Sequence, residues 1–139
     1  MANMKPEEIA YIAGFFDGEG SIYTSKGKKQ YFLTVSITNT NLYVLEFIRE
    51  LLHIGKISKN PDKNLGHRKV YRLRLYSNDA KNFLEILLPY LKVKAEQAKI
   101  AIEFQNKMKN GKLTIPKEEQ EYYRNLISSF NLKKKKQSW

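Results

Sequence analysis

The stretch Ile12-Ala13-Gly14-Phe15-Phe16-Asp17-Gly18-Glu19-Gly20 decides the fold of this chain. It starts as an apolar run that suits a helix, and it ends at two carboxylates, Asp17 and Glu19, each followed by a glycine. Upstream, Pro6 is followed by two glutamates, which is typical of a helix start because proline suits the first turn and acids favour its positive pole. The pattern therefore predicts one helix from Pro6 to the two acids.

This helix carries two distinct lines of side chains. One line is apolar and predicts a core face, formed at helical spacing by Ile9, Ile12, Ala13 and Phe16. The other line is almost bare, with small residues four positions apart at Ala10, Gly14 and Gly18. A bare line lets a second helix backbone approach closely. We expect the helix to contact its own core on one side and another helix on the other.

The two acids stand where a helix disfavours them, because the C-terminal end of a helix carries partial negative charge. A bound Mg²⁺ would reverse that penalty, since hard cations take carboxylate and backbone carbonyl oxygens as ligands. The alternative is that Asp17 and Glu19 are solvated turn residues beside the two permissive glycines, Gly18 and Gly20. Spacing alone does not choose between the two interpretations.

The nine residues resemble the signature of the LAGLIDADG homing endonucleases, in the variant that ends Asp-Gly-Glu-Gly-Ser. Every position fits the pattern of apolar, Ala, Gly, apolar, apolar, Asp, Gly, acid, Gly. A dinucleotide-binding glycine loop does not fit, because the third glycine is replaced by Tyr23 and the motif follows a helix instead of a strand.

Composition limits the function classes. The chain has 139 residues, a formal net charge of +11 and no cysteine. With only two histidines, His53 and His67, a histidine-based zinc centre or a Ser-His-Asp triad is disfavoured. The charge points to a polyanion, either nucleic acid or an anionic membrane. No transmembrane run or signal peptide is recognised. We expect an intracellular protein, in the cytoplasm of a prokaryote or in an organelle, with no membrane partner.

The remaining chain reads as two strand–strand–helix units, over residues 21–53 and 56–88, followed by a helix at 94–109 and a last helix that starts at Pro116. This order predicts an α+β fold with an αββαββα core. Its four-stranded antiparallel, saddle-like sheet would have helices on one face, with C-terminal helices added. We expect a single domain, 1–139, divided into a core (1–109), a C-terminal helix (110–132) and a solvated basic tail (133–139).

The sheet face away from the helices carries no acid in this interpretation. It is rich in short hydrogen-bonding side chains and arginines, which suit base edges, while lysines at the turns suit phosphates. The alternative is an ordinary polar outer face. The predicted DNA-binding residues are Tyr23, Ser25, Lys28, Lys29, Gln30, Phe32, Thr34, Ser36, Ser58, Asn60, Lys63, Arg68, Arg72 and Arg74.

The resemblance implies a mechanism. Because the motif occurs once, the active form would be a homodimer on double-stranded DNA, with Ala10, Gly14 and Gly18 at the dimer interface. Glu19 and the Gly18 carbonyl would hold Mg²⁺, with Mn²⁺ or Ca²⁺ as substitutes for binding. One phosphodiester per strand would be hydrolysed, leaving 3′ overhangs.

The resemblance also implies two further catalytic residues. Lys94 would reach the phosphate or the attacking water. Asn39 stands where the family often has a glutamine that orients water, although it could equally cap the next helix. An arginine of some relatives is replaced here by Tyr43, which leaves that role open.

The resemblance leaves two other functions open: an RNA-binding intron maturase and a non-catalytic DNA-binding regulator of the same fold. Glu19 and Lys94 favour an enzyme, because degenerate relatives tend to lose the acid. An unrelated basic protein that binds ribosomal RNA would explain the charge but not a small-residue helix that ends in acids.

Overall fold

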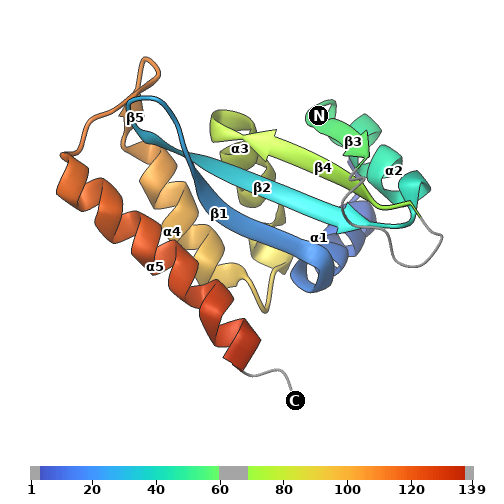
Figure 1. Cartoon of the computed structure of the whole chain (residues 1–139). Coiled ribbons are helices and arrows are strands. Elements are labelled where there is room, and N and C mark those ends of the chain that lie inside the picture. Colours follow the sequence, from blue (N-terminus) through green and yellow to red (C-terminus); the bar gives the residue numbers. More distant parts are fainter. Residues whose placement is uncertain (1–3, 60–68, 137–139) are drawn as a thin grey trace.

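The computed structural model describes residues 4–59 and 69–136, with side chains described through Asn131. The elements in chain order are α1 (Pro6–Glu19), β1 (Gly20–Lys26), β2 (Tyr31–Asn39), α2 (Leu42–Leu52), β3 (Lys56–Lys59), β4 (Tyr71–Tyr76), α3 (Ser77–Leu87), η1 (Leu88–Tyr90), α4 (Ala95–Asn106), β5 (Met108–Lys109), β6 (Lys112–Leu113) and α5 (Lys117–Lys136). Strands β1 to β4 form one antiparallel sheet in the order β1-β2-β4-β3. Figure 1 shows α1, α3 and α4 behind this sheet and α5 along its β1 edge.

Alternating apolar residues place the core on one face of the sheet. In β2, Leu33, Val35 and Ile37 are fully buried. The register pairs Val35 with Ile22 on β1 and with Leu75 on β4, so the apolar residues of three strands lie on the same face. From the helices, the Phe16 ring packs edge-to-face on Phe83 with centroids 5.2 Å apart. The predicted α+β sheet with its helices on one face is confirmed.

Helix α5 covers the exposed edge of β1, a feature that sequence reasoning did not predict. Two side chains reach the Ile22 carbonyl on that edge: Gln97 Nε2 donates at 3.2 Å and Asn131 Nδ2 donates at 3.2 Å. Gln97 Nε2 also donates to the Ile127 carbonyl at 2.9 Å, which ties α4 to α5. An edge strand with unpaired backbone groups is a template for unwanted pairing, and this cover removes it.

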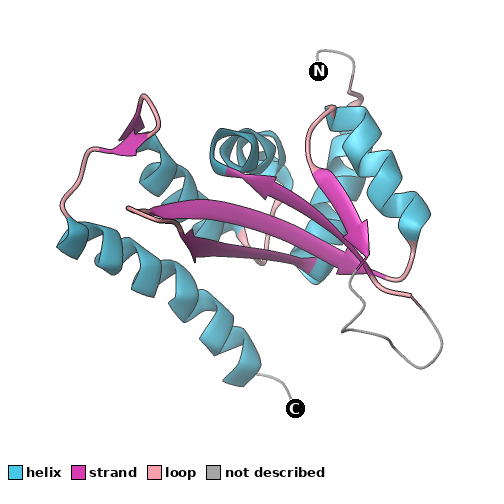
Figure 2. Ribbon diagram, turned by 45° about the horizontal axis from the view of Figure 1, so that its top comes forward, coloured by secondary structure: helices cyan, strands magenta, loops and turns pink. Residues whose placement is uncertain are grey.

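The C-terminal third differs from its predicted boundaries. Helix α4 ends at Asn106, and a short β5–β6 hairpin, which we did not predict, connects it to α5. Figure 2 shows this hairpin, which forms a two-stranded sheet of its own. Helix α5 continues to Lys136, so most of the segment delimited as a tail at 133–139 is helical instead. None of the helices in the described ranges is both long and apolar enough to cross a membrane.

Candidate functional site

The tip of α1 is held by a close contact between Phe16 and Gly20. The Gly20 N–H donates to the Phe16 carbonyl, and the Phe16 ring occupies the space that a Cβ at position 20 would need. The chain therefore passes directly from helix into strand β1. Glu19 lies exposed at this junction, and no hydrogen bond or ion pair to its carboxylate is found within residues 4–59 and 69–131.

Asp17 does not behave as the solvated turn residue that sequence analysis allowed. Its carboxylate accepts the backbone N–H of Lys92 at 2.8 Å and that of Lys94 at 3.0 Å. It thereby fastens the segment before α4 to the end of α1. That alternative is wrong for Asp17, because both oxygens serve a contact between segments 75 and 77 residues apart.

Lys94 lies against the same helix end. It is only 5% exposed, and its Nζ donates to the Asp17 carbonyl at 2.8 Å. The ammonium also lies 6.0 Å from the centroid of the Phe16 ring. A cation at a helix C-terminus is stabilised by the helix dipole. Lys94 thus supplies, within the chain, part of the positive charge that the two acids at this helix end require.

Asn39 lies at the same end of the sheet as Glu19, because Gly20 pairs with Ile37 in the β1–β2 register. Its Oδ1 accepts the N–H of Asn41 at 2.8 Å, and Asn41 in turn caps α2 by accepting the N–H of Val44 at 3.2 Å. The helix cap is therefore Asn41, and the suggestion that Asn39 caps this helix is wrong. Tyr43, in the first turn of α2, is 85% exposed.

The oxygen atoms exposed at the α1 tip are suitable ligands for a hard divalent cation. The Glu19 carboxylate is free of other partners in the described chain, and the Gly18 carbonyl is one of the last four of α1, which have no intrahelical partner. Both are oxygen ligands of the kind that Mg²⁺ and Ca²⁺ prefer. Within the described residues of one chain, no group of three or more His, Cys, Asp or Glu side chains gathers that could hold a metal ion.

The bare line of α1 is exposed. Ala10, Gly14 and Gly18 all face solvent, and a Cβ added at Gly14 or Gly18 would meet nothing within 4 Å. No contact inside the described chain therefore requires glycine there. Glycine within a helix costs roughly 0.5–1 kcal/mol relative to alanine, so two unexplained glycines in one helix are a notable loss of stability.

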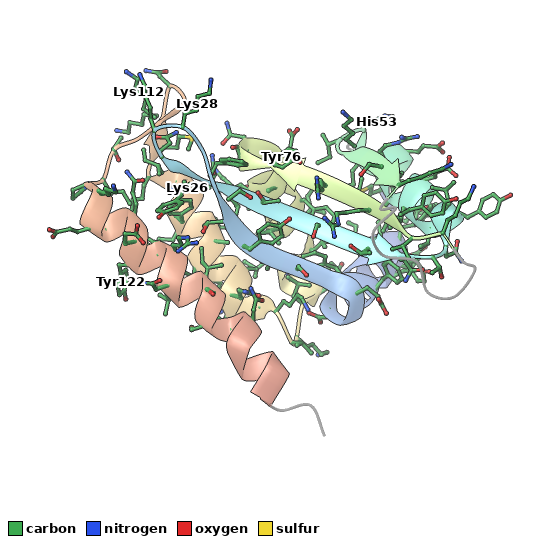
Figure 3. The ribbon with its side chains drawn as sticks, in the orientation of Figure 1. Lys26, Lys28, His53, Tyr76, Lys112 and Tyr122 are labelled. Atoms are coloured by element: carbon green, nitrogen blue, oxygen red, sulfur yellow. The ribbon has the colours of Figure 1, made fainter. Side chains whose placement is uncertain are left out.

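The uncovered face of the sheet has the predicted orientation. Opposite the core residues, the register brings together Tyr23, Ser25, Phe32, Thr34, Ser36, Ser58, Arg72 and Arg74. Figure 3 shows this face with its side chains. Arg72 Nε donates to Thr38 Oγ1 at 3.2 Å, whereas Arg74 Nε is buried with no hydrogen-bond partner in the described part of the chain.

Three of the predicted contact residues are shielded or hydrogen-bonded within the chain. Thr34 and Ser36 are 1% and 6% exposed, so neighbouring side chains shield them, and Thr34 shares a 2.7 Å hydrogen bond with Ser25. Gln30 uses both ends of its amide on the β5–β6 hairpin. In Thr34 and Ser36 the groups are shielded, and in Gln30 a distant hairpin occupies the amide, so DNA contact by these three residues stays a prediction. Asn60, Lys63 and Arg68 lie outside the described residues.

Two further residues lie on this face and were not among the predicted contacts. Lys56 pairs with Arg74 across β3 and β4 and is exposed. Tyr76 is also exposed, and its ring packs edge-on against Phe32 with centroids 5.9 Å apart. The alternation Lys56-Ile57-Ser58 would have identified the lysine, because its neighbour Ile57 faces the core.

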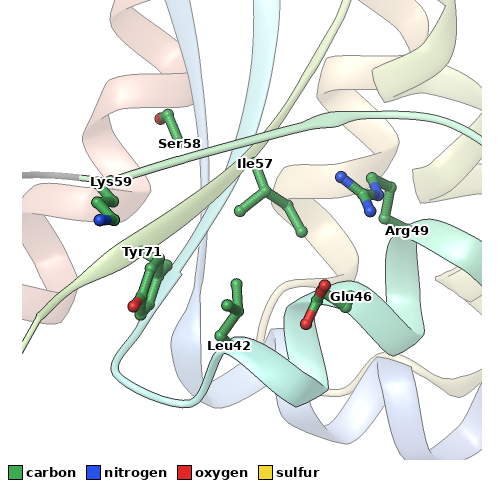
Figure 4. Close-up of a pocket in the computed structure, with 7 residues that line it drawn as sticks. All are labelled: Leu42, Glu46, Arg49, Ile57, Ser58, Lys59 and Tyr71. Carbon is green, nitrogen blue, oxygen red and sulfur yellow. The ribbon is translucent and has the colours of Figure 1, made fainter.

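A separate groove of about 230 Å³ opens between α2 and the β3–β4 edge (Figure 4). It is lined by Leu42, Glu46, Arg49, Ile57, Ser58, Lys59 and Tyr71. Its volume is below the range of roughly 300–1,000 Å³ typical of ligand pockets, and it lacks the paired carboxylates of a hydrolytic site. We assign it no ligand.

Comparison with known proteins decides the family. Residues 6–87, which contain α1 and the whole four-stranded sheet, match the model of the LAGLIDADG-like domain. The chain belongs to the LAGLIDADG family. DNA endonuclease I-CvuI from Chlorella vulgaris is 31% identical over 114 residues, which cover 76% of this chain and 68% of that relative. This match supports the predicted class of a homing endonuclease.

Solved structures of LAGLIDADG homing endonucleases share the fold. I-CvuI in complex with its target, crystallised with 2 mM Ca, superposes with a TM-score of 0.73 at 20% identity, covering 89% of this chain and 82% of that one. The archaeal intron-encoded I-Vdi141I, complexed with DNA, superposes with a TM-score of 0.62 at 20% identity, covering 91% of this chain and 98% of that one. The predicted architecture is thereby confirmed.

Proposed function

We propose that this LAGLIDADG protein is a homing endonuclease. It binds a long, near-palindromic DNA site as a homodimer and hydrolyses one phosphodiester in each strand, leaving 3′ overhangs. One observation carries the proposal: an exposed line of small residues on α1 runs directly into an exposed Glu19 that has no partner in the described chain. Family membership and the DNA endonuclease relative support the same conclusion. A cysteine-free chain also suits an intracellular compartment, prokaryotic or organellar.

In this proposal the bare line of α1 is the dimer interface. Two copies packed along Ala10, Gly14 and Gly18 would bring two α1 tips together, and each would contribute one Glu19. The stability lost by placing glycines in the helix is then offset by close contact between the two helix backbones. The site is shared, because one chain supplies only a single exposed carboxylate at its tip.

Each residue at the tip receives a role. Glu19 and the Gly18 carbonyl would hold Mg²⁺, which when bound would supply charge stabilisation for the scissile phosphate and a more acidic water. Lys94 would draw a phosphate oxygen toward the tip and limit the repulsion between phosphate and carboxylates. Asn39 has its oxygen in use by Asn41, so its amide Nδ2 would be the group that donates to water or phosphate.

The uncovered sheet face would read the DNA. We expect five of its residues to reach base edges, because strands can enter the major groove and present alternate side chains there: Tyr23, Phe32, Ser58, Arg72 and Arg74. The net charge of +11 supplies the non-specific attraction to phosphates. The Ser25 hydroxyl already shares a hydrogen bond with the Thr34 hydroxyl, so we expect it to contribute less to DNA binding.

The decisive experiment compares two charge-matched variants. A target is first selected from randomised duplexes, and Glu19→Gln is then tested for binding and for cleavage with Mg²⁺ or EDTA. Glu85→Gln, at an exposed position on α3, is the control. We expect Glu19→Gln to bind like the wild type but not to cut either strand, and EDTA to abolish wild-type cleavage. Full cleavage activity of Glu19→Gln would refute the assignment of Glu19 to the cleavage site. Selective binding of RNA without DNA cleavage would favour the maturase alternative.

A further inference from the structure

The β5–β6 hairpin has features that the proposed active site does not use. It is closed by Asn110 and Gly111, whose φ angles are +51° and +78°. Two consecutive positive φ angles mark the tight two-residue turn that Asn-Gly favours. Lys109 and Lys112 flank this turn and are directly paired across the hairpin. The turn geometry therefore places two lysines directly opposite each other on the hairpin.

Gln30 fastens this hairpin to the turn between β1 and β2. Its Nε2 donates to the Gly111 carbonyl at 2.9 Å, and its Oε1 accepts the Leu113 N–H at 2.8 Å. The β1–β2 turn is itself closed by a 2.8 Å hydrogen bond from the Gly27 N–H to the Gln30 carbonyl. Two turns that are more than 80 residues apart in sequence thus lie together, and Figure 3 shows Lys28 and Lys112 at the same end of the molecule.

This contact creates an exposed cluster of positive charge. We define the two-turn lysine cluster as Lys26, Lys28, Lys29, Lys109 and Lys112, all of which are exposed. Within the described residues the one ion pair joins Lys99 to Glu96, so no carboxylate neutralises the cluster. Like charges placed directly opposite across a strand pair are destabilising. A polyanion bound to the cluster would relieve that repulsion.

The cluster lies at the far end of β1 from the proposed site of cleavage. Glu19 precedes the first residue of β1, Gly20, and Lys26 is its last residue. Seven residues of strand span roughly 20 Å. The phosphates of one DNA strand are about 3.4 Å apart along the axis, so this span equals roughly six base pairs.

We propose that the two-turn lysine cluster binds the phosphodiester backbone of duplex DNA at the outer end of each half-site, roughly six base pairs or more from the cut. Gln30 is the positioning residue that holds the hairpin against the β1–β2 turn. This inference rests on the proposed endonuclease function and extends it: the segment between α4 and α5 lengthens the footprint beyond the bases that the sheet can read.

The test uses the salt dependence of binding. The double variant Lys109→Gln/Lys112→Gln is compared with Lys81→Gln/Lys99→Gln, which removes the same charge from α3 and α4 on the helical side of the sheet. The slope of log K against log[salt] is negative, and each lost phosphate contact reduces its magnitude by about 0.9, so the hairpin variant should reduce it by about 1.8. At 0.15 M salt this corresponds to about a 30-fold weaker affinity, whereas the control should change little.

Two further readouts separate positioning from misfolding. Gln30→Ala should reduce the magnitude of the slope of log K against log[salt], although it removes no charge. Combined with the hairpin variant, it should reduce this magnitude little further. Ethylation of phosphates should interfere with wild-type binding at the outer positions and not with binding by the hairpin variant. The hairpin variant should melt no lower than the wild type, because the substitution removes a like-charge pair.

The outcomes are distinguishable. The wild-type chain could cut its target normally while the hairpin and control variants show equal slopes of log K against log[salt]. This result would overturn the proposal that the lysine cluster binds DNA and leave the endonuclease proposal intact. A wild-type chain that binds no duplex but binds phosphatidylserine vesicles through these lysines would overturn both proposals.

Discussion

Replacing Gly14 by leucine should make each subunit more stable and yet prevent two subunits from pairing. Position 14 is exposed on α1, and an added Cβ meets nothing within 4 Å. The isolated subunit therefore accepts the side chain without a clash. Leucine has a helix propensity about 0.8–1 kcal/mol better than glycine, which for a chain of this length raises the melting temperature by about 3 °C.

The dimer should respond in the opposite direction. Around a twofold axis each substitution enters the interface twice, and overpacking costs about 1–3 kcal/mol per side chain. The total of about 2–6 kcal/mol raises the dimer dissociation constant by about 30-fold to 10⁴-fold. Double-strand cleavage should fall accordingly, because one chain supplies a single Glu19.

The assay is sedimentation equilibrium together with melting curves over a hundredfold range of protein concentration. The wild-type melting temperature should rise with concentration, since association stabilises the folded state, and that of Gly14→Leu should not. Asn82→Leu, at an exposed position on α3, is the matched control and should dimerise normally. A Gly14→Leu protein that remains dimeric with full activity would refute the assignment of this helix line to the interface.

Three further predictions concern residues elsewhere in the chain. Gly20→Ala should destabilise the fold by about 1–3 kcal/mol in urea unfolding, because its Cβ overlaps a Phe16 ring that Phe83 holds in place; an unchanged midpoint would contradict this packing. Arg72→Ala should cost about 1–3 kcal/mol of binding and relax specificity at one base pair per half-site, and uniform weakening across all sequences would show a phosphate contact instead. Burial, followed by the hydrogen bond to Glu103, raises the pKa of Tyr123 to about 12. Between pH 10 and 12 the folded state keeps a proton that the unfolded state has lost, so stability should fall with pH in that window. Tyr123→Phe should flatten this loss in urea titrations, and Tyr122→Phe, at an exposed position, should not.

The local pattern of the sequence was sufficient for the element types and their faces. Helical spacing predicted the buried line of α1 and four-residue spacing its bare line, and alternation predicted which side chains of β2 and β4 enter the core. These features depend on neighbours a few positions away, which fix the direction of each side chain. The local pattern also placed Asp17 and Glu19 at the end of this helix. It did not separate the role of Asp17 from that of Glu19.

Tertiary structure decided which of those side chains remain available. Asp17 is occupied by backbone groups of Lys92 and Lys94, and Gln30 by a hairpin more than 80 residues later. Thr34 faces the predicted side of the sheet but is buried by its neighbours. Strand order and the cover that α5 provides for β1 likewise follow from packing of the whole core. Periodicity reports the direction of a side chain, whereas its partners depend on contacts between segments that are distant in sequence.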